Sequence, residues 1–194
     1  MVVKVVSMRI TGGQVRGRRL ASLRGLDIRP TSDWVREAIF NLIGQDVTGL
    51  KVLDLFAGTG SLGIEALSRG ALQSLFLDNS AQSLKLINKN LMLCGYEPLG
   101  SILKKDLMRG LPWKLSQMKK KFDLVFMDPP YGKKLISPLL KELADKEILV
   151  SPSVVVAESS KVDSLPVAMR KLQLVNTRTY GETKINIYHF GGNK

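Results

Sequence analysis

The chain has 194 residues, of which 44% are hydrophobic, and a formal net charge of +12. This length and composition are typical of a globular protein of one domain, and no apolar run approaches the roughly 20 residues of a membrane helix. The single cysteine, Cys94, excludes an internal disulfide and indicates a reducing compartment, so we expect a cytoplasmic protein in which Cys94 is buried. The single histidine, His189, argues against a histidine-rich metal site, and we expect no metal ion.

Residues 1–30 form an extension rich in arginine and glycine at the start of the expected domain, 1–194. From Arg9 to Arg36 the chain has seven arginines and two acidic residues, and a second basic segment runs from Lys104 to Lys121. Guanidinium groups bind phosphates bidentately, and clustered positive charge indicates a polyanionic partner. Solubilising surfaces usually mix both signs of charge. We therefore predict RNA contacts from Arg9, Arg16, Arg18, Arg19, Arg29 and Arg36.

The first regular elements are short. Alternating apolar positions in residues 10–23 predict one or two small strands, with a hairpin turn at Gly12–Gly13 or around Gly17. A helix over residues 33–43 follows, because its apolar residues recur at helical spacing and Gly44 can end it.

From residue 50 onward, strand-like and helix-like runs alternate, which is typical of parallel strands joined by right-handed crossovers. We expect strands at 51–56, 74–78, 101–106, 122–128 and 153–159, and helices at 61–69, 80–93 and 132–145. The last two strands, 171–180 and 183–190, flank a Gly-Glu turn and should form an antiparallel hairpin. The prediction is an α/β, Rossmann-like fold with a seven-stranded, mostly parallel sheet, the arrangement of class I S-adenosylmethionine-dependent methyltransferases.

The segment from Lys51 to Gly63, KVLDLFAGTGSLG, predicts a buried strand, a glycine-rich turn and the start of a helix. Its glycines have G-x-G-x-x-G spacing between a strand and a helix, which is the context that makes the pattern meaningful. Glycine lets the backbone lie close to a ligand, and a helix N-terminus offers free N–H groups. We therefore expect cofactor contacts from the turn residues Phe56, Ala57, Gly58 and Gly60.

Two acidic residues indicate which cofactor binds there. Asp78 ends the next apolar run and can accept both ribose hydroxyls of an adenosine-containing cofactor. Asp54 would repel a pyrophosphate, since two unit charges about 4 Å apart interact by about 4 kcal/mol at an effective dielectric near 20. S-adenosylmethionine carries an ammonium and a sulfonium instead, so Asp54 favours it over NAD. A glycine turn that serves packing alone is the remaining alternative.

A second motif, Asp128-Pro129-Pro130-Tyr131, directly follows an apolar strand. Ligands of open α/β sheets bind at the carboxyl ends of strands, where this motif lies. The two prolines make a rigid corner that presents carbonyl oxygens, and the tyrosine offers a face on which a base can stack. We predict that these four residues are catalytic and hold an exocyclic amine, with Asp128 as acceptor, for methyl transfer to a base that is unpaired or flipped out.

Asp106 ends the third predicted strand and can accept from the adenine amino group of the cofactor, although a solvated acid among lysines is an alternative. The same D-P-P-Y corner can hold any exocyclic amine, so an adenine-N6 methyltransferase of DNA or RNA is a rival interpretation. An RNA-binding assembly protein without catalysis is another, and an NAD-dependent oxidoreductase is disfavoured by Asp54 and by the lack of a convincing proton-transfer residue.

Five segments together resemble the bacterial 16S ribosomal RNA guanine-N2 methyltransferases of the RsmD type: RITGGQVRGRRL, RPTSDWVREAIFNLI, DLFAGTGSLGIEALSRGA, LFLD and DPPY. The resemblance covers nearly the whole chain, and its amino-terminal segments carry the narrower assignment. It implies S-adenosylmethionine as cofactor, and 16S rRNA or the small ribosomal subunit as partner, and we expect a monomer. It also implies contacts of Asp54, Gly58 and Gly60 with the methionine end, Asp78 with the ribose and Asp106 with the adenine.

Overall fold

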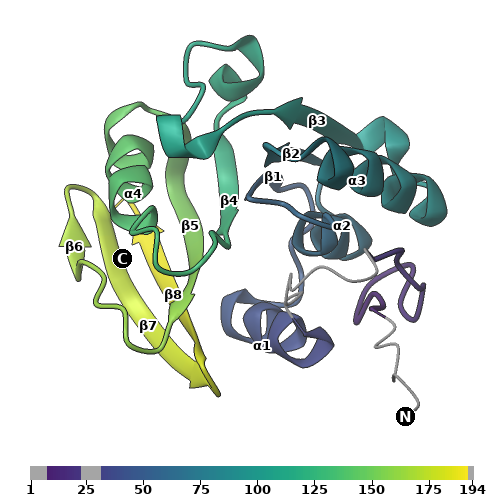
Figure 1. Cartoon of the computed structure of the whole chain (residues 1–194), viewed down its shortest axis with the longest axis horizontal. Coiled ribbons are helices and arrows are strands. Elements are labelled where there is room, and N and C mark those ends of the chain that lie inside the picture. The colour runs from purple at the N-terminus through teal and green to yellow at the C-terminus, as the bar shows by residue number, and fades with distance from the viewer. Residues whose placement is uncertain (1–7, 23–31, 192–194) are drawn as a thin grey trace.

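The computed structural model describes residues 8–22 and 32–191 and contains a central sheet flanked by helices (Figure 1). The sheet has eight strands in the order β3-β2-β1-β4-β5-β8-β7-β6. Their bounds are β1 Lys51–Leu55, β2 Gln73–Asp78, β3 Gly100–Lys104, β4 Phe122–Met127, β5 Leu149–Ser160, β6 Ala168–Met169, β7 Leu172–Tyr180 and β8 Thr183–Phe190. The first five strands pair in parallel, and β8 and β7 are antiparallel to their neighbours, which confirms the predicted architecture.

The predicted number of seven strands is wrong by one. The additional strand, β6, has two residues and pairs with the start of β7 through Ala168 and Gln173 and through Met169 and Leu172. A strand this short carries no alternation of apolar and polar residues, so the sequence pattern gave no sign of it.

Helices cover both faces of the sheet. The α-helices are α1 Asp33–Ile43, α2 Ser61–Ser68, α3 Ala81–Cys94 and α4 Ile136–Asp145, and the short 3₁₀ helices are η1 Glu97–Leu99, η2 Leu107–Arg109 and η3 Ser116–Lys120. The helix predicted at 132–145 begins four residues later, because Gly132 and Lys134 have positive φ angles of 76° and 51° that a right-handed helix cannot include. Among the described residues no helix is long and apolar enough to cross a membrane.

The core consists of two clusters, one on each face of the sheet. The first joins the amino-terminal segment, α1, α2 and α3 to one face, and includes Ile10, Phe40, Ile64 and Phe126. The second joins α4, η2 and η3 to the other face. Because both faces are covered, the parallel strands consist of continuous apolar runs. Cys94 in α3 is buried, which confirms that prediction.

The amino-terminal segment forms a small hairpin as expected, but in place of the predicted short strands residues 8–22 contain a single isolated antiparallel bridge, between Arg9 and Arg19. Its glycine pair packs directly on the end of α2: the Ser68 hydroxyl donates to the Gly12 carbonyl at 2.6 Å. A Cβ at Gly13, where φ is +76°, would lie 1.9 Å from the Ser68 carbonyl oxygen. Gly12–Gly13 therefore serves close contact with α2 as well as the turn.

Candidate active site

A cavity of about 480 Å³ opens at the carboxyl ends of the parallel strands, a size typical of ligand pockets. Each of the five parallel strands contributes residues at or just beyond its C-terminal end. Ten of the eleven residues predicted from sequence for cofactor and catalysis line it: Asp54, Phe56, Ala57, Gly58, Asp78, Asp106, Asp128, Pro129, Pro130 and Tyr131.

The eleventh predicted residue, Gly60, is not among the lining residues and lies behind the turn. It precedes α2 with φ +77°, and a Cβ there would approach the side chains of Ile64 and Ile87 to 3.3 Å. The third glycine of the motif, Gly63, allows α2 to pack on β2, because its Cβ would lie 2.3 Å from the Phe76 ring. These two glycines shape the turn from behind, whereas Gly58 lines the cavity itself.

The turn itself has a strained backbone. Phe56 has φ +60°, a left-handed conformation that a bulky side chain rarely adopts, and Gly58 has φ +54°. Such residues persist where the surrounding structure enforces them, often at ligand sites. Here the Ala57 N–H donates to the Leu77 carbonyl at 3.0 Å and holds the turn against the end of β2.

Asp78 is fixed as an acceptor facing the cavity. One carboxylate oxygen accepts from the Gly58 N–H at 2.9 Å, and the other accepts from the Ser80 N–H at 2.8 Å. Each oxygen has further acceptor capacity, so the carboxylate can still accept from two hydroxyl groups. This geometry suits a ribose held beside Gly58.

Asp54 lines the cavity but is only 2% exposed. Its carboxyl accepts from the Gly63 N–H at 2.9 Å. Burial raises the pKa of Asp54 to about 8, the hydrogen bond from Gly63 opposes this rise, and the nearby Asp78 charge adds to it. This raised pKa favours a protonated Asp54 at neutral pH, and a cation placed beside it would favour the carboxylate.

Asp106 lies two residues beyond β3 rather than at its end, because that strand stops at Lys104. Its carboxylate caps η2 by accepting from the Met108 N–H at 3.0 Å and contacts the Arg109 guanidinium at 3.5 Å. Its side chain is 40% exposed and also lines the cavity. The exposed Met108 and the buried Leu107 of the same turn line the cavity as well and offer apolar contact to a planar ring.

The D-P-P-Y corner faces the same cavity from the end of β4. The Tyr131 hydroxyl donates to the Glu158 carboxylate at 3.0 Å and lies 2.9 Å from the Thr183 hydroxyl. Burial, opposed by the Thr183 hydrogen bond and aided by the Glu158 charge, raises the pKa of Tyr131 to about 12, so its hydroxyl stays a donor. The phenol ring is thus fixed at one end while 43% of the residue is exposed.

Sequence reasoning missed Glu158, which is 8% exposed and lines the cavity near the end of β5. It lies within the apolar run VVVAESS, so composition did not set it apart. Its place near the carboxyl end of a predicted parallel strand was the available signal, the same signal that identified Asp128.

The predicted RNA-binding arginines divide by exposure. Arg9, Arg16, Arg18 and Arg19 are exposed on the amino-terminal hairpin, and Arg29 lies outside the described residues. The prediction for Arg36 is wrong, because its side chain is 0% exposed and cannot meet RNA.

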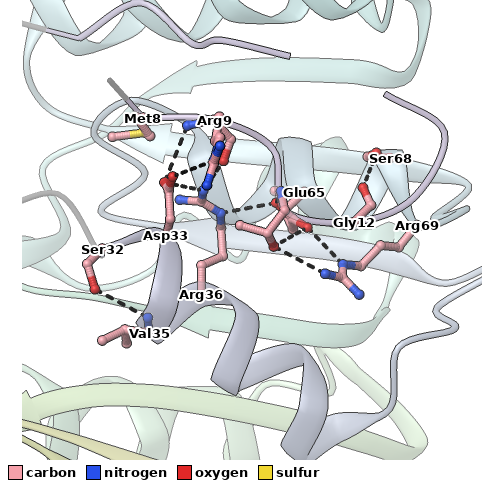
Figure 2. A network of polar contacts seen from close by, with 12 residues as sticks. Met8, Arg9, Gly12, Ser32, Asp33, Val35, Arg36, Glu65, Ser68 and Arg69 are labelled. Carbon is pink, nitrogen blue, oxygen red and sulfur yellow. Dashed lines mark hydrogen bonds and ion pairs between the residues drawn. The ribbon is translucent and has the colours of Figure 1, made fainter. Parts of the chain in front are cut away.

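Arg36 belongs to a buried network instead (Figure 2). Its guanidinium lies 3.1 Å from Glu65 and 2.9 Å from Asp33, and it also donates to the Arg9 carbonyl. Glu65 pairs in turn with Arg69 at 2.9 Å and accepts from the Thr11 N–H at 2.8 Å. The network joins the hairpin, α1 and α2.

The residues around the cavity suit a cationic, adenosine-containing cofactor. Asp78 presents acceptors beside a glycine that leaves room for a ribose, and Asp54 is a buried acid that a cation would neutralise. Residues 8–22 and 32–191 contain no group of three or more His, Cys, Asp or Glu side chains that could hold a metal ion. This cavity, on a sheet with a terminal antiparallel hairpin, defines a Rossmann-like class I methyltransferase.

Comparison with known proteins narrows this class. The family model described as "Conserved hypothetical protein 95" matches residues 8–189, and the chain belongs to this family. Ribosomal RNA small subunit methyltransferase D from Haemophilus influenzae is 32% identical over 183 residues, which cover 93% of each protein. These matches confirm the family resemblance seen in the sequence.

Solved structures agree with the fold. The structure of yhhF from Escherichia coli has a TM-score of 0.83 and 30% identity, and the match covers 96% of this chain and 99% of that chain. An RNA methyltransferase from Salinibacter ruber, solved with S-adenosyl-L-homocysteine, shares the fold at 16% identity with a TM-score of 0.64, over 85% of this chain and 95% of that chain.

Proposed function

We propose that this protein transfers a methyl group from S-adenosylmethionine to the exocyclic N2 amine of a guanine in 16S rRNA. One observation carries the proposal: the D-P-P-Y corner and the acids Asp54 and Asp78 line a single cavity. A cofactor held by the two acids and a base held by the corner would therefore meet within it. Membership of a family that includes ribosomal RNA small subunit methyltransferase D supports RNA as the substrate.

S-adenosylmethionine, when bound, supplies an activated methyl group on a sulfonium. Asp78 would hold its ribose, Asp106 its adenine amino group, and Asp54 its positively charged methionine end. The raised pKa of Asp54 supports this last role, because a buried acid gains most from a cation beside it. NAD would place a pyrophosphate there instead, beside which Asp54 would stay protonated and offer no opposite charge.

Asp128 and the Pro129 carbonyl would accept the two N–H groups of the target amine and so aim its nitrogen at the methyl group. Positioning of this kind lowers the barrier without covalent participation of the protein. Asp128 can then take up the proton that the nitrogen loses on methylation. Tyr131, held by Glu158 and Thr183, would stack on the flipped base.

The exposed arginines of the amino-terminal hairpin, together with the basic segment 104–121, would bind the phosphate backbone of the RNA. The extension 1–30 would thus be a substrate-binding part of one methyltransferase domain, acting as a monomer in the cytoplasm. Because Arg36 is buried, the proposal rests on Arg9, Arg16, Arg18 and Arg19, and on Arg29 from the sequence alone.

Nucleoside mass spectrometry tests the proposal. The protein is incubated with S-adenosylmethionine and with small subunits reconstituted on unmodified 16S rRNA, and the digested RNA should contain N2-methylguanosine. N6-methyladenosine would overturn the choice of base. Binding to the RNA with no methylated nucleoside would indicate the assembly-protein alternative. Asp128→Ala provides the control for a contaminating activity, since it should lose the product while still binding the cofactor.

A further inference from the structure

Two aromatic side chains meet on the surface outside the cavity. Trp34, the second residue of α1, is 62% exposed, and its ring lies 4.9 Å from the Tyr180 ring at an interplanar angle of 86°. An edge-to-face contact covers one face of one ring only. Trp34 therefore keeps an aromatic face open to a ligand, while Tyr180, which is half-buried against the core, supports its ring.

The pair lies at the same edge of the sheet as the cavity. β8 is antiparallel to β5, and β7 is antiparallel to β8, so β7 runs in the direction of the parallel strands. Tyr180, the last residue of β7, is consequently at the carboxyl edge (Figure 1). Tyr180 pairs with Thr183, whose hydroxyl lies 2.9 Å from that of Tyr131 at the mouth of the cavity.

On its other side the pair adjoins the basic hairpin. Asp33, the neighbour of Trp34, lies 3.5 Å from the exposed guanidinium of Arg9. Arg9 pairs with Arg19 in the hairpin that also carries the exposed Arg16 and Arg18. A chain of contacts thus leads from the arginine-rich hairpin through Trp34 to the D-P-P-Y corner.

Further basic side chains lie near the D-P-P-Y corner in the sequence or on β7. Lys133 and Lys134, which closely follow Tyr131, and Arg178 near the end of β7 are exposed. A single exposed tryptophan is unremarkable by itself. An exposed tryptophan, supported by a half-buried tyrosine and lying between two groups of cations, is the combination found where single-stranded nucleic acid binds, because cations hold the phosphates and rings stack on the bases.

We propose that Trp34, supported by Tyr180, stacks on an unpaired nucleobase of the RNA substrate next to the base that enters the cavity. The proposal rests on the proposed function, since it takes the substrate to be RNA with a flipped base. Extrusion of one base removes stacking from its neighbours. A ring at the rim of the cavity would replace that stacking and hold the strand open.

Fluorescence can report on this contact, because the chain has only two tryptophans. Trp113→Phe leaves Trp34 as the sole tryptophan, and titration with an unmodified 16S rRNA transcript should quench its emission to saturation. Trp34→Phe leaves Trp113, which is 41% exposed and lies under the ammonium groups of Lys114 and Lys146. Because Trp113 lies in the basic segment 104–121, which would itself contact the RNA, this variant records how much of the emission change comes from that segment. The quenching seen with Trp113→Phe is then assigned to Trp34 alone.

Kinetics supply a second readout. Trp34→Ala should raise the KM for the RNA by about five- to 100-fold, the effect of losing one base–aromatic stack, with kcat changed far less. Trp34→Phe should restore most of the affinity, and both variants should bind S-adenosylmethionine as the wild type does. This last comparison separates lost stacking from a misfolded site.

The outcomes are distinguishable. If the wild type methylates the RNA but Trp34 emission stays unchanged and Trp34→Ala keeps the wild-type KM, the stacking proposal fails while the proposed function stands. A lower melting temperature with an unchanged KM would show that Trp34 only packs against Tyr180. If the wild type neither binds nor methylates the RNA, both proposals fail.

Discussion

Asp54→Asn removes the buried ionisable group that faces the cofactor cavity. The carboxyl of Asp54 has a pKa of about 8 in the folded protein against 3.8 for an unperturbed aspartate. The folded state therefore retains a proton that the unfolded chain has lost between about pH 4 and pH 8. Over that window this one group lowers the free energy of unfolding by about 1.4 kcal/mol for each unit of rising pH.

The contribution of Asp54 to the free energy of unfolding can be measured by comparing two pH values. Between pH 5.5 and pH 7.5, Asp54 is ionised in the unfolded chain but protonated in the folded protein, and this difference should lower the wild-type free energy of unfolding by about 2–3 kcal/mol over the two pH units. Asparagine at this position contributes no such change. Asparagine has nearly the same size and keeps an oxygen that can accept from the Gly63 N–H. Titration of the remaining groups is common to both proteins, so the difference in pH dependence belongs to position 54.

Urea unfolding of both cofactor-free proteins, followed by far-UV circular dichroism at the two pH values, measures this difference. Parallel stability curves for wild type and variant would refute the raised pKa of Asp54. The cofactor adds an independent check, because binding of a cation requires the ionised carboxyl. Wild-type affinity for S-adenosylmethionine should rise up to about tenfold per pH unit below pH 8, and the affinity of the variant should be weaker and flatter.

Three further predictions concern the substrate and the buried network. Asp128→Ala should lower kcat at least about 100-fold in the methylation assay while calorimetry shows unchanged cofactor affinity; near-normal turnover would mean that another residue orients the amine. Neutralising Arg16, Arg18 and Arg19 together should reduce the slope of log RNA affinity against log salt concentration by about two to three in magnitude. An unchanged slope would exclude the amino-terminal hairpin as the phosphate contact. Glu65→Ala should lower the free energy of unfolding, measured with urea, by about 3–5 kcal/mol, because the buried Arg36 and Arg69 lose the carboxylate that they share. A decrease below about 1 kcal/mol would contradict this.

Much of the site could be predicted because one topological rule governs it. In a parallel sheet with alternating helices, the residues that follow each strand meet at one edge, and the positions of Asp54, Asp78, Asp106 and Asp128 relative to the apolar runs were readable from sequence. Glu158 follows the same rule but lies inside a strand of twelve residues. The structure places its side chain in the lining of the cavity, where it accepts from the hydroxyl of Tyr131, a partner 27 residues away in the sequence.

Burial of charge was the least predictable property. Arg36 and its neighbour Arg9 both lie in an arginine-rich stretch, and nothing local distinguishes them. Arg36 is buried because Glu65, 29 residues later in the sequence, lies across from it in α2. Charge clustering in sequence therefore indicated a basic surface correctly, but assignment of individual arginines to that surface required the packing of the helices.

The Glu65 network also explains how a helix that carries a charged residue can be fully buried. All eight residues of α2 are buried, so an isolated Glu65 carboxylate there would carry a large desolvation cost. Two guanidinium groups and the backbone and hydroxyl of Thr11 satisfy it. Both hydrogen bonds come from the one residue Thr11, so they hold this point of the amino-terminal hairpin against α2. The same helix follows the cofactor turn, so the buried carboxylate fixes the arginine-bearing hairpin in one position relative to the cavity.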